Sequence, residues 1–220
     1  MTPRPEIAEH DGEVIPGLPG PLPAGESILW QGSPIWQGVA RRGLFVRGVV
    51  IYFLLLALLR GADLTAGGAG LSETLAGAAL LVVIGAVPVA LLLLFAGLSA
   101  RSTLYTITTR RIVLRVGVAL PMTINIPFAV IESAGVIRHA DGTGDVVVKV
   151  MEPHRVSWMA LWPHISPFRL ARPEPMLRAL ADADEAAQIL ARALAASTER
   201  QAPAVVSAGV SAPDRAEAMA

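Results

Sequence analysis

The sequence predicts a membrane-anchored α+β protein, in which a transmembrane helical hairpin carries an antiparallel β-domain closed by a C-terminal helix. Three observations predict this fold class. The chain of 220 residues is 53% hydrophobic and only 16% charged, whereas soluble domains average about 25% charged residues. Residues 75–98 form a charge-free apolar run that is long enough to cross a bilayer. Residues 105–117 follow closely and alternate in the manner of a β-strand.

The part of the chain before the first apolar run divides into two segments. Residues 1–24 are predicted to be a flexible arm rich in proline and glycine, because proline removes backbone hydrogen-bond donors. Residues 25–43 form a pre-membrane segment that contains Trp30 and Trp36. Tryptophan at this position often lies at the level of the lipid headgroups. The alternative, in which both rings pack into the folded domain, stays equally open.

Residues 44–98 are predicted to be the transmembrane hairpin, with spans at 44–59 and 75–98 and a flexible glycine-containing loop between them. The first span would be about 24 Å long as a helix, which is shorter than the ~30 Å hydrocarbon core. Arg47 and Arg60 near its ends could reach the interfaces and compensate. Arginines gather on both flanks of the hairpin. The positive-inside rule therefore predicts a multi-pass protein with both termini in the cytoplasm.

Residues 99–197 are predicted to form the cytoplasmic β-domain, as a meander of four or five strands. Asp141–Gly144 (Asp-Gly-Thr-Gly) is a strong turn signal. Pro175 can open a helix over residues 175–196, since the first helical turn does not need its missing N–H, and leucines follow at helical spacing. Residues 198–220 are polar and aperiodic, which predicts a disordered tail.

Composition and motifs argue against several classes of function. The chain has no cysteine, which excludes disulfides and thiolate chemistry, and its zero net charge argues against nucleic-acid binding. The four histidines lack metal-ligand spacing, and no nucleophile elbow or phosphate-binding loop is present. Asp141 stands in a single copy of a motif that aspartic proteases need twice. We therefore expect no enzyme activity, no metal site and no cofactor.

Two sets of residues are candidates for contacts with the membrane or a partner. The first is a basic group that follows the second span: Arg101, Arg110, Arg111 and Arg115. Near anionic headgroups each arginine contributes on the order of 1 kcal/mol, although fixing the topology of the hairpin is the simpler role. The second set lies in an aromatic stretch whose prolines exclude a helix or a central strand: Trp158, Trp162, His164 and Phe168. These side chains are either exposed anchors or ordinary core.

Three motifs in order along the chain resemble membrane-tethered bacterial pleckstrin-homology-like (PH-like) domains: Gly25–Trp30, residues 105–117 and residues 126–132. Within that group, three further features resemble the PuhB-type photosynthetic complex assembly proteins of purple bacteria. They are Asp141–Asp145, the Leu-Trp-Pro-His stretch at residues 161–164, and a terminal helix that begins with residues 175–180. PuhB-type proteins are often described with three membrane segments, whereas this sequence predicts two.

The resemblance implies a non-catalytic assembly factor for the photosynthetic reaction centre and its core light-harvesting complex. It implies reaction-centre and core light-harvesting subunits as partners, anionic lipid headgroups as neighbours, and the bacterial cytoplasmic (intracytoplasmic) membrane as the location. It supplies no catalytic or pigment-binding residue. The alternative function is a membrane-tethered PH-like protein that binds lipid or acts as a scaffold outside photosynthesis. The oligomeric state stays open.

Overall fold

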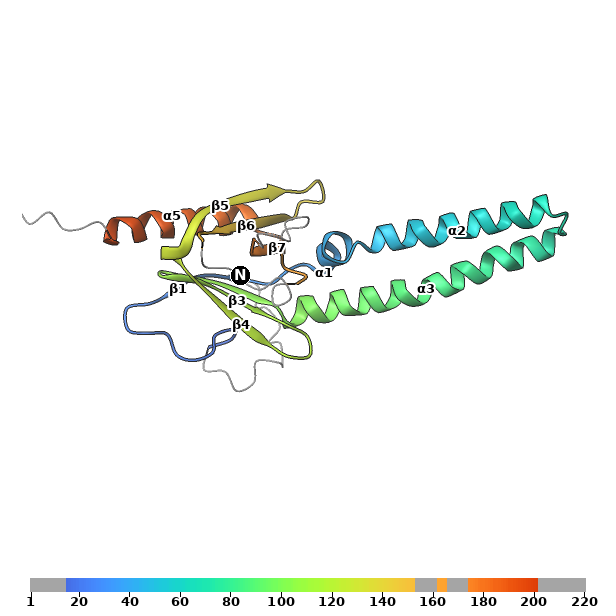
Figure 1. Ribbon diagram of the computed structural model, residues 1–220. Coiled ribbons are helices and arrows are strands. Elements are labelled where there is room, and N and C mark those ends of the chain that lie inside the picture. Colours follow the sequence, from blue (N-terminus) through green and yellow to red (C-terminus); the bar gives the residue numbers. More distant parts are fainter. Residues whose placement is uncertain (1–14, 153–161, 166–173, 202–220) are drawn as a thin grey trace, which may run out of the picture.

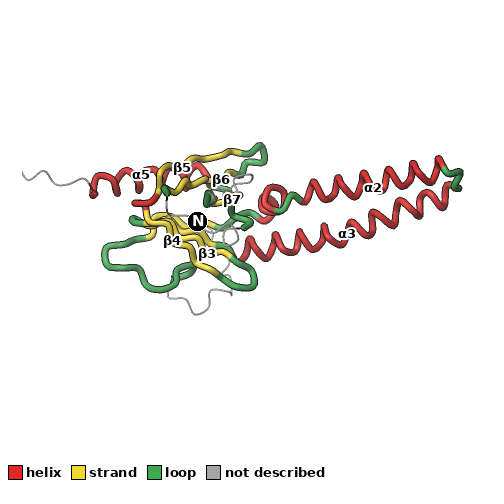
Figure 2. Tube along the Cα trace, in the orientation of Figure 1, coloured by secondary structure: helices red, strands yellow, loops and turns green. Residues whose placement is uncertain are grey.

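The computed structural model describes residues 15–152, 162–165 and 174–201. A long helical hairpin projects from one end of a β-domain, and a C-terminal helix lies on the opposite part of that domain (Figure 1). Coloured by secondary structure, the molecule separates into an all-helical hairpin and a domain that holds all the described strands (Figure 2). The predicted α+β architecture, with a helical hairpin, an antiparallel β-domain and a C-terminal helix, is confirmed.

The β-domain consists of two antiparallel sheets. The first sheet has the order β1-β2-β3-β4, with bounds Ile28–Gly32, Leu104–Thr108, Arg111–Val116 and Met122–Pro127. The second sheet has the order β5-β6-β7, with bounds Ile131–Arg138, Gly144–Val150 and Met176–Leu180. The short helix η3 (Phe128–Val130) joins the two sheets. The predicted turn at residues 141–144 connects β5 to β6, so this part of the meander is as the sequence predicts.

The hairpin is an insertion between two paired strands of the β-domain. β1 precedes the hairpin and β2 follows it, yet Gly32 of β1 lies opposite Tyr105 of β2. The predicted domain boundary at residue 99 therefore leaves out one strand. Trp30 on β1 is buried, and its Nε1 donates to Oδ2 of Asp182 at 3.0 Å, whereas Trp36 stays 45% exposed. Trp30 therefore packs into the folded domain, whereas the headgroup location of Trp36 stays a prediction.

The hairpin begins with two short turns, α1 (Trp36–Gly38) and η2 (Val39–Gly43), before the long helices α2 (Val46–Ala66) and α3 (Leu71–Ser102). Both long helices are apolar and long enough to cross a membrane, and only 6% of each apolar window is buried. The predicted first span was too short: with 21 residues, α2 is about 31 Å long. The Arg60–Asp63 ion pair (2.8 Å) and the Thr65 hydroxyl, which donates to Gly61 O, support the extra turns.

The predicted helix at residues 175–196 is wrong in its first part. Residues 176–180 form β7, in which every residue is buried, and the helix α5 spans Ala183–Gln201. Leu177 and Leu180 fit a helical spacing, and because β7 is buried on both faces, its central Arg178 included, it shows no alternation that would mark a strand. α5 also extends beyond residue 198, into the segment predicted as a disordered tail, whose residues from 202 onward lie outside the described part.

The core lies between the two sheets and α5, with Tyr105, Ile112, Leu177 and Leu190 among its fully buried residues. The second half of the predicted flexible arm packs on this domain. Leu18 is only 3% exposed, and Nε2 of Gln31 donates to the carbonyl of Pro16 at 3.0 Å. Residues 1–14 of the arm lie outside the described residues.

Candidate functional site at the junction of hairpin and β-domain

The four candidate arginines do not form one cluster. Arg101 is in the last turn of α3, and Arg115 lies opposite Leu104 at the hairpin end of the first sheet. Arg110 and Arg111 lie beyond the other end of the five-residue strand β2, about 17 Å away at 3.3 Å per residue. The chain reverses there, so these two side chains are carried away from the end of α3, contrary to the prediction that all four lie beside the membrane exit.

Arg111 has a structural partner at that far end of the sheet. Its Nε donates to Oε1 of Glu26 at 2.9 Å, and the Glu26 side chain is only 2% exposed. Thr108 Oγ1 donates to the same carboxylate oxygen at 2.7 Å. Because a buried carboxylate needs such partners, Arg111 serves to neutralise Glu26 within the fold.

The aromatic stretch contacts the base of the hairpin. Trp162 is 44% exposed and stacks on Phe95 of α3, with ring centroids 5.5 Å apart and an interplanar angle of 27°. His164, predicted as a candidate surface contact, is fully buried, so that expectation is corrected. Trp158 and Phe168 lie outside the described residues.

His164 is the centre of a buried polar network. Its Nδ1 lies 2.6 Å from the Tyr105 hydroxyl, and its Nε2 lies 3.1 Å from Thr103 Oγ1 and 3.4 Å from Ser99 Oγ. The Tyr105 hydroxyl oxygen also accepts a hydrogen bond from the backbone N–H of Arg178 at 3.2 Å. The network therefore joins the last turn of α3, the start of β2, β7 and the segment 162–165.

Burial determines the protonation states in this network. It lowers the pKa of His164 to about 3, with a further contribution from the nearby Arg178 charge, and burial raises the pKa of Tyr105 well above its usual range. At neutral pH the imidazole is uncharged and the phenol is protonated. We assign the phenol proton to the bond with Nδ1 and the ring proton to Nε2. Both ring nitrogens are then used inside the protein, so His164 is not available to ligate a pigment or a metal.

A second buried group connects β6, β7 and the start of the hairpin. Asp145 is 4% exposed; its Oδ1 accepts from the N–H of Ala179 at 2.6 Å, and its Oδ2 lies 3.0 Å from Nε2 of His139. Ala179 has a φ of 52°, a left-handed conformation that costs energy for a residue with a side chain. Its carbonyl accepts from the N–H of Ile35 at 2.8 Å. A Cβ on Gly38 would lie 2.4 Å from that of Ala179, so α1 can approach β7 only with glycine there.

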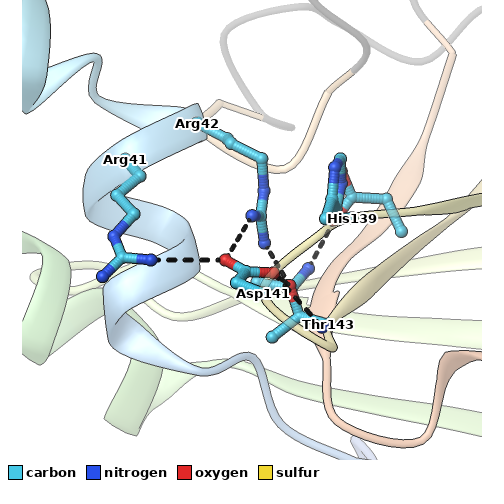
Figure 3. Close-up of polar contacts among 7 residues, drawn as sticks. Arg41, Arg42, His139, Asp141 and Thr143 are labelled. Atoms are coloured by element: carbon cyan, nitrogen blue, oxygen red, sulfur yellow. Dashed lines mark hydrogen bonds and ion pairs between the residues drawn. The ribbon is translucent and has the colours of Figure 1, made fainter.

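A third contact fastens η2 to the β5–β6 turn at the surface (Figure 3). Arg42 Nη1 donates to Oδ2 of Asp141 at 2.8 Å, Arg42 Nη2 donates to Oγ1 of Thr143, and Arg41 approaches Asp141 at 3.5 Å. Hydrogen bonds from Thr143 and Arg42 hold the pKa of Asp141 well below its usual range. The sequence indicated the turn but not these partners, because Arg41 and Arg42, two of the arginines that flank the hairpin, are about 100 residues away.

Together these contacts clamp the hairpin to both sheets, and we call this set the double clamp: the His164–Tyr105 network, the Asp145–Ala179–Ile35 group and the Arg42–Asp141 contact. α3 ends directly before β2, in the first sheet, while α1 and η2 are held by the second sheet. Within the described residues no group of three or more histidine and acidic side chains could hold a metal ion. Because of these contacts, a shift of the hairpin would move the β-domain with it.

The hairpin end of the domain also exposes apolar side chains. The β3–β4 loop begins at Gly117, whose φ is 113° and where a Cβ would lie 2.2 Å from the carbonyl oxygen of Leu120. The tight turn therefore requires glycine. Beyond it, Leu120 is 78% exposed, and Val118 and Met122 on either side are 36% and 43% exposed. An apolar loop is thus placed at the same end of the domain as the hairpin.

Comparisons with known proteins agree with this architecture. A family model described as "Bacterial PH domain" matches residues 45–194. The chain is also 37% identical, over 91% of its length and 93% of the relative's, to a protein of Rhodobacter capsulatus named as an uncharacterized 23.7 kDa protein in the puhA 5' region. No solved structure matches. These matches are consistent with the PuhB-type resemblance, and the chain belongs to the bacterial PH domain family.

Proposed function

We propose that the protein is a non-catalytic assembly factor for the photosynthetic reaction centre and its core light-harvesting complex. The Rhodobacter capsulatus relative is named for a gene position beside puhA, in the same series of gene names as PuhB. A neighbour of this kind is what the PuhB-type resemblance predicts. The alternative, a lipid-binding or scaffolding role outside photosynthesis, gives no reason for that position.

In this proposal the hairpin crosses the bacterial cytoplasmic membrane twice and leaves both termini in the cytoplasm. Its outward faces are free for the transmembrane helices of a nascent subunit: Leu58, Val83 and Leu91 are 69%, 64% and 60% exposed. The β-domain then lies at the cytoplasmic headgroup level, where it binds the cytoplasmic surface of the same subunit. This contact keeps the nascent subunit from associating prematurely with other subunits.

The double clamp is the observation that carries this mechanism. A domain on a flexible tether would sample many orientations, whereas a domain held at both ends of the hairpin presents one surface at one height above the membrane. A subunit bound by the hairpin would therefore meet the β-domain in a single orientation. Pre-orientation of this kind lowers the entropic cost of a second contact.

The absence of cysteine from the chain allows a direct test by site-specific cross-linking. Leu58→Cys, labelled with a photoactivatable maleimide in native membranes during induced pigment synthesis, is expected to cross-link to a reaction-centre or core light-harvesting subunit. Ala57→Cys is the matched control, because Ala57 is only 6% exposed and its label would not reach a partner. Cross-links from Leu58→Cys to lipid alone, or the same protein partners in cells that make no photosynthetic complex, would contradict the proposal.

A further inference from the structure

A groove of about 710 Å³ lies between the start of the hairpin and the last turns of α3. Ile35 and Trp36 line one side, and Leu93, Leu94 and Gly97 line the other, with Arg101 at one end. Its volume is within the range of about 300–1,000 Å³ that is typical of sites for small molecules. A Cβ built on Gly97 would have no atom within 4 Å, so the groove is empty beside this residue.

The groove changes from apolar to cationic along α3. From Leu93 to Arg101 the helix rises about 12 Å, close to the ~15 Å depth of one leaflet of a ~30 Å hydrocarbon core. Leu93 and Leu94 lie toward the spanning part of α3, whereas Arg101 is in its last turn, next to the β-domain. Trp36 is 45% exposed, as is common for tryptophan at a membrane interface.

Among the described residues, Arg101 has no counter-charge. It is exposed, none of the other residues that line the groove is charged, and among the described residues none pairs with it. The two arginines of the Arg42–Asp141 contact, in comparison, share a carboxylate. The electrostatics of the groove are therefore complementary to one anionic group at its β-domain end.

We propose that this groove binds one anionic phospholipid, with an acyl chain along Leu93, Leu94 and Gly97 and the headgroup phosphate on Arg101. The order of apolar wall, interfacial tryptophan and arginine matches the order of chain, glycerol region and phosphate in a lipid that stands parallel to α3. The cation at its end distinguishes this groove from the exposed apolar faces farther along the hairpin, such as the one at Val83 and Leu91, which suit a partner helix. The inference rests on the membrane-anchored fold and does not depend on the assembly role.

The test measures quenching of Trp36 fluorescence by phospholipids with brominated acyl chains, using the full chain in nanodiscs. The Trp36 signal is obtained as the difference between the wild-type chain and Trp36→Phe. We expect brominated phosphatidylglycerol to quench Trp36 at about a fivefold lower mole fraction than brominated phosphatidylcholine, as one arginine near an anionic headgroup implies. Arg101→Gln is expected to remove this preference, and Gly97→Leu to reduce quenching by both lipids.

Arg110→Gln is the matched control, because Arg110 is an exposed arginine at the far end of β2 and should leave the preference unchanged. The thermal unfolding midpoint of Gly97→Leu is measured as a folding control. A midpoint equal to that of the wild-type chain shows that the variant retains the fold. Equal quenching by the two lipids in the wild-type chain, or an unchanged preference in Arg101→Gln, would overturn the proposal. The proposal would also be overturned if neither lipid quenched Trp36 in the wild-type chain and a co-purified membrane polypeptide covered the groove.

Discussion

The Tyr105 hydroxyl links three parts of the fold through one atom. It bonds to His164 Nδ1 at 2.6 Å and accepts from the N–H of Arg178 at 3.2 Å, within a region where Tyr105 and His164 are fully buried. Buried polar groups that lose a partner keep the cost of their desolvation. The hydroxyl therefore matters to stability through the groups that it satisfies as well as through its own bonds.

Tyr105→Phe keeps the ring but leaves His164 Nδ1 and the Arg178 N–H without their partner. We expect it to lower the free energy of unfolding of the detergent-solubilised chain by about 1–3 kcal/mol. Urea unfolding followed by tryptophan fluorescence measures this change. Tyr52→Phe is the matched control, since Tyr52 is 57% exposed on α2 and should change the stability little. Equal stability of the two variants would show that the network is not a structural element.

The low pKa of His164 predicts a specific pH dependence. The unfolded imidazole titrates near 6.5, whereas in the folded protein the pKa is about 3, so between these values only the unfolded state gains the proton. The free energy of unfolding should fall as the pH drops from 6.5 toward 3, by up to about 1.4 kcal/mol per unit from this group. Above pH 6.5 the group should have no effect.

His164→Gln removes the titration and keeps a side chain that can donate and accept hydrogen bonds. The difference in unfolding free energy between wild type and variant should therefore change with pH below 6.5 and stay constant above it. Urea unfolding at a series of pH values from 4 to 8 measures both slopes. Parallel curves for the two proteins would contradict the burial of a neutral imidazole.

The sequence could place these residues only in part. It located His164 in a segment shaped by prolines and identified residues 105–117 as strand-like, but it left burial and exposure as equal alternatives. Whether His164 is buried depends on hydrogen-bond partners about 60 positions away in the chain: Ser99, Thr103 and Tyr105. No local pattern carries information about contacts at that separation.

At the scale of elements, regular alternation and turn chemistry were reliable guides. The turn that begins at Asp141 lies where the sequence predicts it, and the strand-like residues 105–117 form β2 and most of β3, separated by a bend at residues 109–110. β7 was assigned to a helix because its residues are buried on both faces. β1 was left outside the domain because five residues, separated from β2 by the whole hairpin, give no local sign of their pairing.

The Arg42–Asp141 contact predicts how firmly η2 is held. Asp141→Asn removes the charge on which two arginines converge, so we expect faster amide hydrogen exchange in residues 39–43 and 139–143. Asp184→Asn is the matched control, because it breaks an ion pair with Arg138 between side chains that are 54% and 70% exposed, and it should leave exchange at the junction unchanged. Equal exchange in both variants would show that η2 is held by packing alone.

The contact should also respond to acid. Because the pKa of Asp141 lies below its usual value, its contribution is present above the ordinary carboxyl range and is lost as the pH falls below it. Exchange at residues 39–43 of the wild-type chain should therefore approach that of Asp141→Asn only in strong acid. The Arg42–Asp141 contact should therefore stay formed throughout the physiological range.

At the scale of the whole molecule, a helical hairpin is inserted into a β-domain and held by both sheets. The sequence predicted the two parts and their order, since composition and periodicity report membrane helices and strands directly. It could not predict that the domain starts before the hairpin. That arrangement makes hairpin and domain one unit, which is the basis of the proposed assembly role.

The most direct test is the rate at which reaction-centre and core light-harvesting pigment absorbance appears after induction in a strain that lacks this gene. We predict slower accumulation than in the parent strain, with full recovery on expression of the wild-type chain or Asp184→Asn and partial recovery with Asp141→Asn. Accumulation at the parental rate in the deletion strain would contradict the proposed function.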